Sequence, residues 1–260
     1  MNAMLPSYFV SHGSPALALD PGATGAFWEE LGRKLPRPNA VLCVSAHWMT
    51  TVPAVSLAAR PETIHDFYGF PAPLYEIRYP APGAPALAER AAALLAAAGI
   101  ETARDPERGL DHGAWVPLRS MYANADLPAT QLAIQPRSDA AWHYRLGEAL
   151  APLRREGVLL LASGGAVHNL RAVDWRGGTT PGWAREFDDW LAAALAAGDS
   201  EALIAWEKTA PHARQAHPTE DHFLPLFVAL GAAGQGARGT RIHAGFTLGS
   251  LSMAAFEIGG

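Results

Sequence analysis

The 260-residue sequence has one cysteine, no long apolar run and no excess of basic residues. Because Cys43 is the single cysteine, the chain forms no internal disulfide, and its apolar surroundings favour a buried thiol over a nucleophile. No stretch of about 18 apolar residues is present, which excludes a membrane-spanning helix. The N-terminus lacks the basic and apolar regions of a signal peptide, so we expect a soluble, cytoplasmic protein with no membrane partner.

The charge balance excludes a further class of partner. Lysine and arginine together number 20 against 25 acidic residues, which gives a net charge of -5 and no basic stripe for nucleic acid. Hydrophobic residues make up 49% of the chain, enough for a sizeable core. We therefore expect one domain over residues 1–260, and the sequence does not decide between a monomer and a homo-oligomer.

The order of apolar and helical segments predicts an α/β fold with a central, mostly parallel or mixed sheet flanked by helices. The expected strands are 8–11, 40–46, 129–134 and 158–163, with a shorter apolar stretch at 54–58. The expected helices are 22–34, 84–98, 140–155, 183–197, 201–207 and 219–230. The C-terminal part, 240–257, is expected to form two short strands around Gly249. Residues 61–83 are rich in proline, glycine and aromatics, which predicts an irregular segment packed over a site.

Three histidines stand at the ends of expected buried strands. His12 and His47 each close a short apolar run, and His168 follows a third run and two glycines. In an open α/β sheet, ligands and catalytic groups gather beyond the carboxyl ends of the strands. We therefore expect these three imidazoles to converge at one edge of the sheet, in the manner of a metal site.

Two further histidines lie beside chemistry-bearing neighbours. Thr219 is placed to cap a short helix whose first turn holds Glu220, Asp221 and His222. His112 lies in a loop that leads into an apolar helix. Both segments could add donors to the same site.

The remaining histidines receive weaker assignments. His65 lies in the aromatic segment that is expected to fold over a pocket. His143 and His243 stand in ordinary helix and strand contexts, and we assign them no role. His212 and His217 lie on a polar loop, where solvent exposure is the default expectation.

Several common motifs are missing. The sequence has no phosphate-binding glycine loop, no C-x-x-C and no H-E-x-x-H. Ser163-Gly164-Gly165 does not form a G-x-S-x-G nucleophile elbow, so a serine hydrolase is poorly supported. What remains is a histidine-rich site that is assembled from distant segments.

Short segments in order along nearly the whole chain resemble the class III extradiol ring-cleaving dioxygenases, specifically their DOPA-dioxygenase-like branch. The matching segments are 11–15 (SHGSP), 45–48 (SAHW), 63–71 (TIHDFYGFP), 79–83 (YPAPG), 111–115 (DHGAW), 163–171 (SGGAVHNLR), 218–225 (PTEDHFLP) and 249–253 (GSLSM). Because they recur in order, chance does not account for them.

The resemblance implies a mononuclear metal bound by His12 and His47 and completed near His222. In the wider class the third ligand is a carboxylate. Glu220 and Asp221 are therefore alternatives, although the DOPA-like branch favours His222. Fe(II) is the metal implied for activity, and Zn(II) is compatible with a purified or crystallised form. By the same resemblance His168 acts as the catalytic acid or base, and as a fourth ligand in a resting zinc form.

The resemblance also implies the substrates, a catechol and dioxygen, and a ring-opened semialdehyde as product. His112 is expected to hydrogen-bond the substrate or oxygen. His65, Trp48, Phe67 and Tyr68 are expected to line the substrate pocket. The sequence does not distinguish DOPA from caffeate, protocatechuate or other catechols.

Two other functions stay open at this level. A zinc-dependent hydrolase suits a site built of histidines. A non-enzymatic binding protein on the same fold is the third possibility. The presence of His168 and His112 beside the metal set favours an enzyme.

Overall fold

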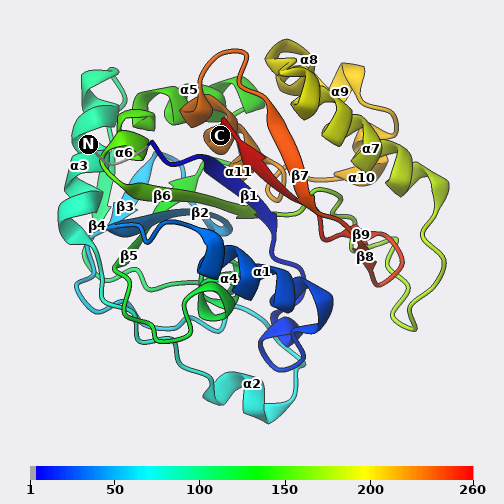
Figure 1. The fold of residues 1–260 in the computed structure, drawn as a ribbon, viewed down its shortest axis with the longest axis horizontal. Coiled ribbons are helices and arrows are strands. Elements are labelled where there is room, and N and C mark those ends of the chain that lie inside the picture. The colour runs from blue at the N-terminus through cyan, green and yellow to red at the C-terminus, as the bar shows by residue number, and fades with distance from the viewer. Residues whose placement is uncertain (1–3, 260) are drawn as a thin grey trace.

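An eight-stranded sheet runs through the computed structural model, which describes residues 4–259 (Figure 1). Its strand order is β4-β3-β5-β2-β6-β1-β10-β7. The strands of this sheet are β1 Ser7–Ser11, β2 Ala40–Met49, β3 Ala54–Ser56, β4 Ala103–Asp105, β5 Ala129–Ile134, β6 Val158–Gly164, β7 Gly239–His243 and β10 Ala255–Ile258. A separate small hairpin pairs β8 (Phe246–Thr247) with β9 (Leu251–Ser252).

The four central strands, β5, β2, β6 and β1, are mutually parallel. β10 and β7 continue the sheet in antiparallel fashion, and β3 pairs antiparallel with β5 on the other side. The prediction of a mixed α/β sheet is therefore confirmed. Because the central strands are parallel, their carboxyl ends share one edge of the sheet, which is where α/β proteins bind their ligands.

Helices cover both faces of the sheet (Figure 1). They are η1 Pro15–Ala18 (a short 3-10 helix), α1 Gly22–Lys34, α2 Ala72–Glu76, α3 Pro85–Ala97, α4 His112–Met121, α5 Ala140–Leu150, α6 Pro152–Arg155, α7 Gly182–Ala197, α8 Ser200–Ile204, α9 Trp206–Thr209, α10 Ala213–Ala216 and α11 Leu224–Ala233. Within residues 4–259, none of them combines the length and the apolar character needed to cross a bilayer.

Strand alternation divides the buried apolar side chains into two large cores. Leu42 and Val44 of β2 pack in one core with α3, α5, α7 and α11. Val41 and Cys43 of the same strand pack in the other core with α1 and α4. Successive side chains of a strand point to opposite faces, so the continuous apolar run of β2 indicates a strand that is covered on both faces.

Most expected elements form close to their predicted bounds. The helix 22–34 and the strand 129–134 agree with α1 and β5. The single helix expected over 140–155 is divided at Ala151, because Pro152 supplies no amide hydrogen and begins α6 instead. The C-terminal part contains β7, β8, β9 and β10 rather than two strands.

Two departures concern the predicted site. β2 continues to Met49, so His47 lies within the strand rather than after it. The helix expected from Thr219 begins only at Leu224, with Pro225 in its first turn. His222 therefore belongs to the turn before α11 and not to a capped first helical turn.

The expectation that His217 is exposed is wrong. Its side chain is fully buried, and its Nε2 lies 3.0 Å from the carbonyl oxygen of Ala166. The ring stacks on Phe223 at a centroid distance of 4.5 Å, beside Phe187 and Trp206. This aromatic packing supplies the burial that a polar local sequence does not suggest.

His143 is expected to make the metal-free protein less stable in acid. Its Nδ1 lies 2.8 Å from the carbonyl oxygen of Asp139, and its Nε2 accepts a hydrogen bond from the Gln135 amide at 3.1 Å. An imidazole that donates through one nitrogen and accepts through the other is neutral. Burial lowers the pKa of His143 from its ordinary 6.5 to about 4.

Between these two pKa values the unfolded chain therefore binds a proton at His143 that the folded chain does not. The contribution of neutral His143 to stability is complete above its ordinary pKa and is lost as the pH falls toward its folded pKa. Between about pH 7 and about pH 5 the contribution is about 2 kcal/mol. We expect the free energy of unfolding in urea to fall, between about pH 7 and about pH 5, by about 2 kcal/mol less in His143→Gln than in the parent protein. An equal loss in the two proteins would contradict the assignment.

Candidate metal centre

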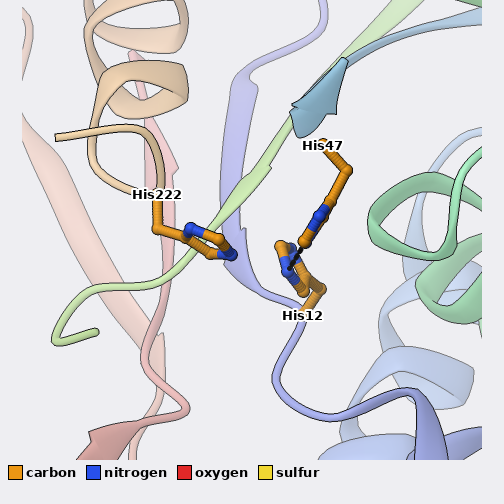
Figure 2. Close-up of side chains that lie close together, drawn as sticks. All are labelled: His12, His47 and His222. Atoms are coloured by element: carbon orange, nitrogen blue, oxygen red, sulfur yellow. Dashed lines mark hydrogen bonds between the residues drawn. The ribbon is translucent and has the colours of Figure 1, made fainter. Parts of the chain in front are cut away.

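Three imidazoles from three separate segments meet at the carboxyl edge of the central strands. His12 directly follows β1, His47 lies near the end of β2 and His222 lies just before α11 (Figure 2). One nitrogen of each ring lies within 4.8 Å of one nitrogen of each other ring. The Nε2 atoms of His12 and His47 are 2.9 Å apart. The arrangement gathers nitrogen donors, which suit a divalent transition metal.

Hydrogen bonds on the far sides of two rings determine which nitrogen points inward. The Oγ of Ser163 donates to the carbonyl oxygen of Gly113, so it accepts from the Nδ1 of His12 at 3.0 Å. The Nδ1 of His222 lies 2.5 Å from the carboxylate of Asp221, which accepts only. In both histidines Nδ1 therefore carries the hydrogen, and Nε2 offers its lone pair to the centre.

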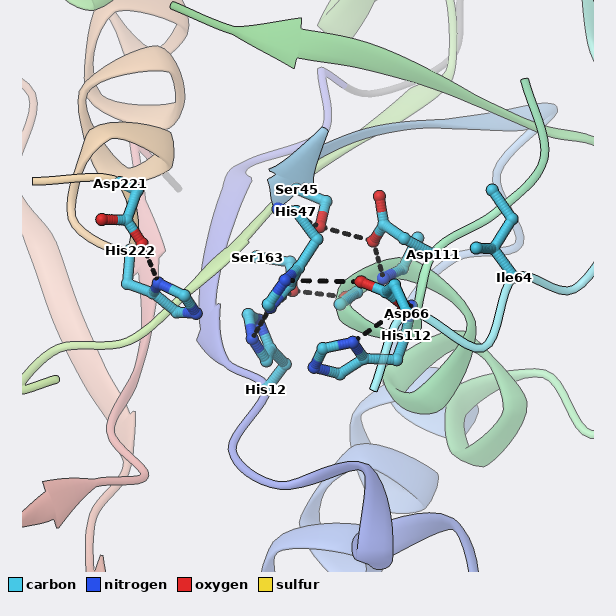
Figure 3. A network of polar contacts seen from close by, with 12 residues as sticks. His12, Ser45, His47, Ile64, Asp66, Asp111, His112, Ser163, Asp221 and His222 are labelled. Atoms are coloured by element: carbon cyan, nitrogen blue, oxygen red, sulfur yellow. Dashed lines mark hydrogen bonds and ion pairs between the residues drawn. The ribbon is translucent and has the colours of Figure 1, made fainter. Parts of the chain in front are cut away.

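Asp66 lies between His47 and a further histidine, His112 (Figure 3). Its carboxylate lies 3.4 Å from the Nδ1 of His47 and 3.0 Å from the Nδ1 of His112. Burial by itself raises the pKa of Asp66, but the hydrogen bond with His112 and the nearby His47 lower the pKa to about 2. Asp66 is thus an anion that accepts a hydrogen bond from His112 and lies beside His47, and it comes from the segment 61–83, in which α2 is the regular element.

His12 and His222 are buried, His47 is partly buried, and all three are uncharged at neutral pH. His12 is 2% exposed and His222 is 7% exposed. Burial, followed by the neighbouring imidazoles, lowers the pKa of His12 well below its ordinary value, and burial does the same for His222. Burial and the neighbouring His112 lower the pKa of His47 to about 4. At neutral pH each lone pair is therefore free to bind a cation.

His168 lies beside these three but outside their group. Its ring stacks on that of His222 with centroids 3.5 Å apart and planes 5° apart. It forms a second possible ligand group with Asp221 and His222. Burial lowers the pKa of His168 to about 4. His168 thus contributes a neutral imidazole to the same cavity.

The two carboxylates considered as ligands face elsewhere. The carboxylate of Glu220 lies 3.4 Å from the guanidinium of Arg214. Asp221 turns toward the Nδ1 of His222. Of the three candidates in this segment, His222 shares a group with His12 and His47.

The histidines open into a cavity of about 260 Å³, whose walls include Phe67 and His112. Three expected wall residues lie elsewhere, in disagreement with the prediction. Tyr68 is 90% exposed. Trp48 follows His47 in β2 and so points to the opposite face, where the guanidinium of Arg108 lies over its ring. His65 lies behind Phe67, with its Nε2 3.1 Å from the carbonyl oxygen of Ile77.

Supporting residues behind the centre were not predicted from the sequence. Asp111 is fully buried, caps α4 through the Ala114 amide and accepts a hydrogen bond from the Oγ of Ser45 at 2.6 Å. Ser45 lies two residues before His47 on the same strand and therefore on the same face. The spacing of two residues between Ser45 and His47 in a buried strand was the sequence signal for this supporting contact. Ser163 at the end of β6 supports His12 in the same way.

Gly164→Ala is expected to displace His222. A Cβ at this position would lie 2.1 Å from the carbonyl oxygen of His222, a backbone atom that also accepts the Gly165 amide hydrogen bond at 2.9 Å. The turn before α11 would have to move, and a shift of a ligand's support costs about 10- to 100-fold in metal affinity. Competition with a chelator measures this affinity. Gly182→Ala is the matched control, because a Cβ at that position makes an ordinary contact at 3.5 Å. An unchanged metal affinity in Gly164→Ala would contradict the close approach of Gly164 to the His222 carbonyl oxygen.

The fold and the centre together define a class, an α/β protein whose carboxyl-edge site offers three neutral imidazoles to one metal ion. Comparison with known families defines it further. The family described as the catalytic LigB subunit of aromatic ring-opening dioxygenase matches residues 6–255. The chain belongs to this family, whose extradiol dioxygenases are metal-dependent.

Curated relatives extend over nearly the whole chain. A protein of Beta vulgaris named 4,5-DOPA dioxygenase extradiol is 43% identical over 96% of this chain and 95% of its own length. A protein of the same name from Escherichia coli is 43% identical, with coverage of 98% and 95%. A crystal structure of an uncharacterized protein from Escherichia coli K12 superposes with a TM-score of 0.80 at 37% identity, covering 98% of this chain and 100% of that one. These relatives support extradiol ring-opening dioxygenase activity.

Proposed function

We propose that this chain opens the aromatic ring of a DOPA-like catechol with dioxygen, at one Fe(II) ion held by His12, His47 and His222. The convergence of three ring nitrogens carries the proposal, supported by outer hydrogen bonds that leave the Nε2 lone pairs of His12 and His222 for the centre. When bound, Fe(II) supplies the Lewis acidity and the electron transfer that ring opening by dioxygen requires. Zn(II) fits the same donors, so a purified sample can hold zinc without being active.

His168 is the proposed acid and base. It lines the cavity, its ring is neutral and it is supported by stacking on His222. A neutral imidazole in reach of the substrate can take the proton of a catechol hydroxyl and return it to the ring-opened product. His168 is further proposed as a fourth ligand in a zinc-loaded form, as the family resemblance implies, because its ring stacks on that of His222 beside the other ligands.

His112 is proposed to orient the catechol. Its Nδ1 is held by Asp66, which leaves its Nε2 for a hydrogen bond with a substrate hydroxyl. The backbone amide of His112 also donates to Asp66 at 3.0 Å, which holds the whole residue at the start of α4. The substrate-facing nitrogen is therefore placed by two contacts with one carboxylate.

The walls suit a planar aromatic ring. Phe67, Val167 and Leu251 contribute apolar surface around the histidines. Such walls exclude water from the substrate ring and leave the polar atoms to the imidazoles, as in most small-molecule sites. We place this function on one catalytic domain that covers residues 1–260 and locate it in the cytoplasm.

A zinc hydrolase and a binding protein remain the alternatives, and oxygen uptake separates them from a dioxygenase. The metal-free protein is loaded anaerobically with Fe(II) or, in parallel, with Zn(II), and is mixed with a panel of catechols. On admission of oxygen we expect uptake and a yellow semialdehyde band with Fe(II) and neither with Zn(II). Absence of uptake with every catechol, in protein that has retained its Fe(II), would overturn the proposal.

A further inference from the structure

A second cavity of about 530 Å³ adjoins the metal cavity. It lies between the segment from η1 to the start of α1 and residues 243–248 around β8, which Figure 1 shows near one another. Ser14, Phe70, Trp175 and Leu248 line both cavities. We call the second cavity the annexe. Because these four residues line both spaces, the annexe lies directly beside the cavity of the histidines.

Leu248, one of the residues that line both cavities, is held in place by hydrogen bonds of its backbone. Leu248 has a φ of +49°, a left-handed conformation that costs a residue other than glycine about 1–3 kcal/mol. Its carbonyl oxygen accepts hydrogen bonds from the amides of Asp174 at 2.9 Å and Ser250 at 3.0 Å, which hold this backbone in place. The side chain of Leu248 is thus presented to both spaces by a rigid turn.

The charge of the two cavities is one-sided. Among residues 4–259, no lysine or arginine lines either cavity, whereas the exposed carboxylate of Asp20 lines the annexe. His243, the other titratable residue of the annexe, lies 3.2 Å from the Oγ1 of Thr24 and stacks on Phe27. Burial lowers the pKa of His243, which keeps it uncharged at neutral pH. A carboxylate placed in the annexe would meet an anion and no protein cation.

We propose that the annexe binds the ring substituent of the catechol and selects for a substituent without net negative charge, either neutral or carrying an ammonium group. The zwitterionic side chain of DOPA satisfies this condition, whereas a lone carboxylate does not. This inference rests on the proposed ring-opening function, and it assigns to Asp20 the role of a specificity-determining residue.

A matched substrate series tests the inference. Hydroxytyrosol, dopamine and dihydrocaffeate carry a neutral, a cationic and an anionic group on a two-carbon chain, and unsubstituted catechol does not reach the annexe. With the Fe(II)-loaded enzyme we expect kcat/KM for dihydrocaffeate to be about tenfold or more below that for hydroxytyrosol, because an unpaired carboxylate loses its hydration. If catechol is turned over but the three substituted compounds show no preference by charge, the annexe proposal alone would be overturned. If no compound is turned over, the ring-opening function would be overturned.

Substitution of Asp20 supplies the second arm. Asp20→Lys is expected to raise kcat/KM for dihydrocaffeate and to lower it for dopamine by about threefold each, the scale of an exposed charge pair. Unsubstituted catechol should respond to Asp20→Lys less than either charged compound. Asp20→Asn removes the charge without reversing it, so it should shift dihydrocaffeate and dopamine in the same directions as Asp20→Lys but by smaller factors. Equal effects of Asp20→Lys on all four compounds, or none, would contradict the assigned role.

Discussion

His12→Ala is expected to abolish metal binding and, with it, ring opening. His12 contacts His47 directly through the two Nε2 atoms and lies at the centre of the cluster, with its ring centroid 4.9 Å from that of His47 and 5.2 Å from that of His222. Loss of a residue that only supports a ligand costs about 10- to 100-fold in metal affinity, so loss of the ligand itself should cost more than about 100-fold. Metal analysis after gel filtration and oxygen uptake with Fe(II) measure the two effects.

The matched control is His212→Ala. His212 lies on the surface, where its Nε2 is 2.7 Å from the carboxylate of Glu186. It should retain metal and activity. A His12→Ala protein that holds as much metal as the His212→Ala protein would contradict the ligand assignment.

His168→Gln is expected to retain the metal and to lose turnover. Because His168 lies outside the group of His12, His47 and His222, its removal leaves three nitrogen donors in place. General acid–base catalysis contributes about 10²- to 10⁴-fold, so kcat should fall by that factor. Steady-state oxygen uptake and metal content, determined on the same preparation, separate the two effects.

His168→Ala extends this test through chemical rescue. Added imidazole can enter the vacated space and carry the proton, so part of the lost rate should return. A purely structural role would show no rescue. Loss of the metal to the same extent as in His12→Ala would show that His168 is a ligand in the active form and not the acid or base.

The position of the site was readable from strand ends because of a simple physical rule. The apolar runs that precede His12 and His168 indicate buried parallel strands, and the carboxyl ends of parallel strands meet at one edge. The same rule applied to His47, although β2 continues for two residues beyond it. Local patterning therefore located most of the centre without knowledge of the tertiary structure.

The supporting contacts depended on tertiary structure. Asp66 lies in a segment without regular periodicity, and its contacts with His47 and His112 arise only when that segment folds across the sheet edge. Likewise, Tyr68 and Phe67 are adjacent in the sequence, yet one is exposed and the other lines the cavity. Composition indicates that such a segment covers a site, but it does not determine which side chains face inward.

The product formed by the Fe(II)-loaded protein tests the central claim most directly. Hydroxytyrosol is incubated with the enzyme and a measured amount of oxygen, and oxygen uptake is recorded. The molecular mass of the product is then determined by mass spectrometry. We expect one molecule of oxygen consumed per molecule of substrate, and a product with the mass of the substrate plus two oxygen atoms. A metal-loaded protein that consumes no oxygen, or a product that has gained only the elements of water, would contradict a ring-opening dioxygenase.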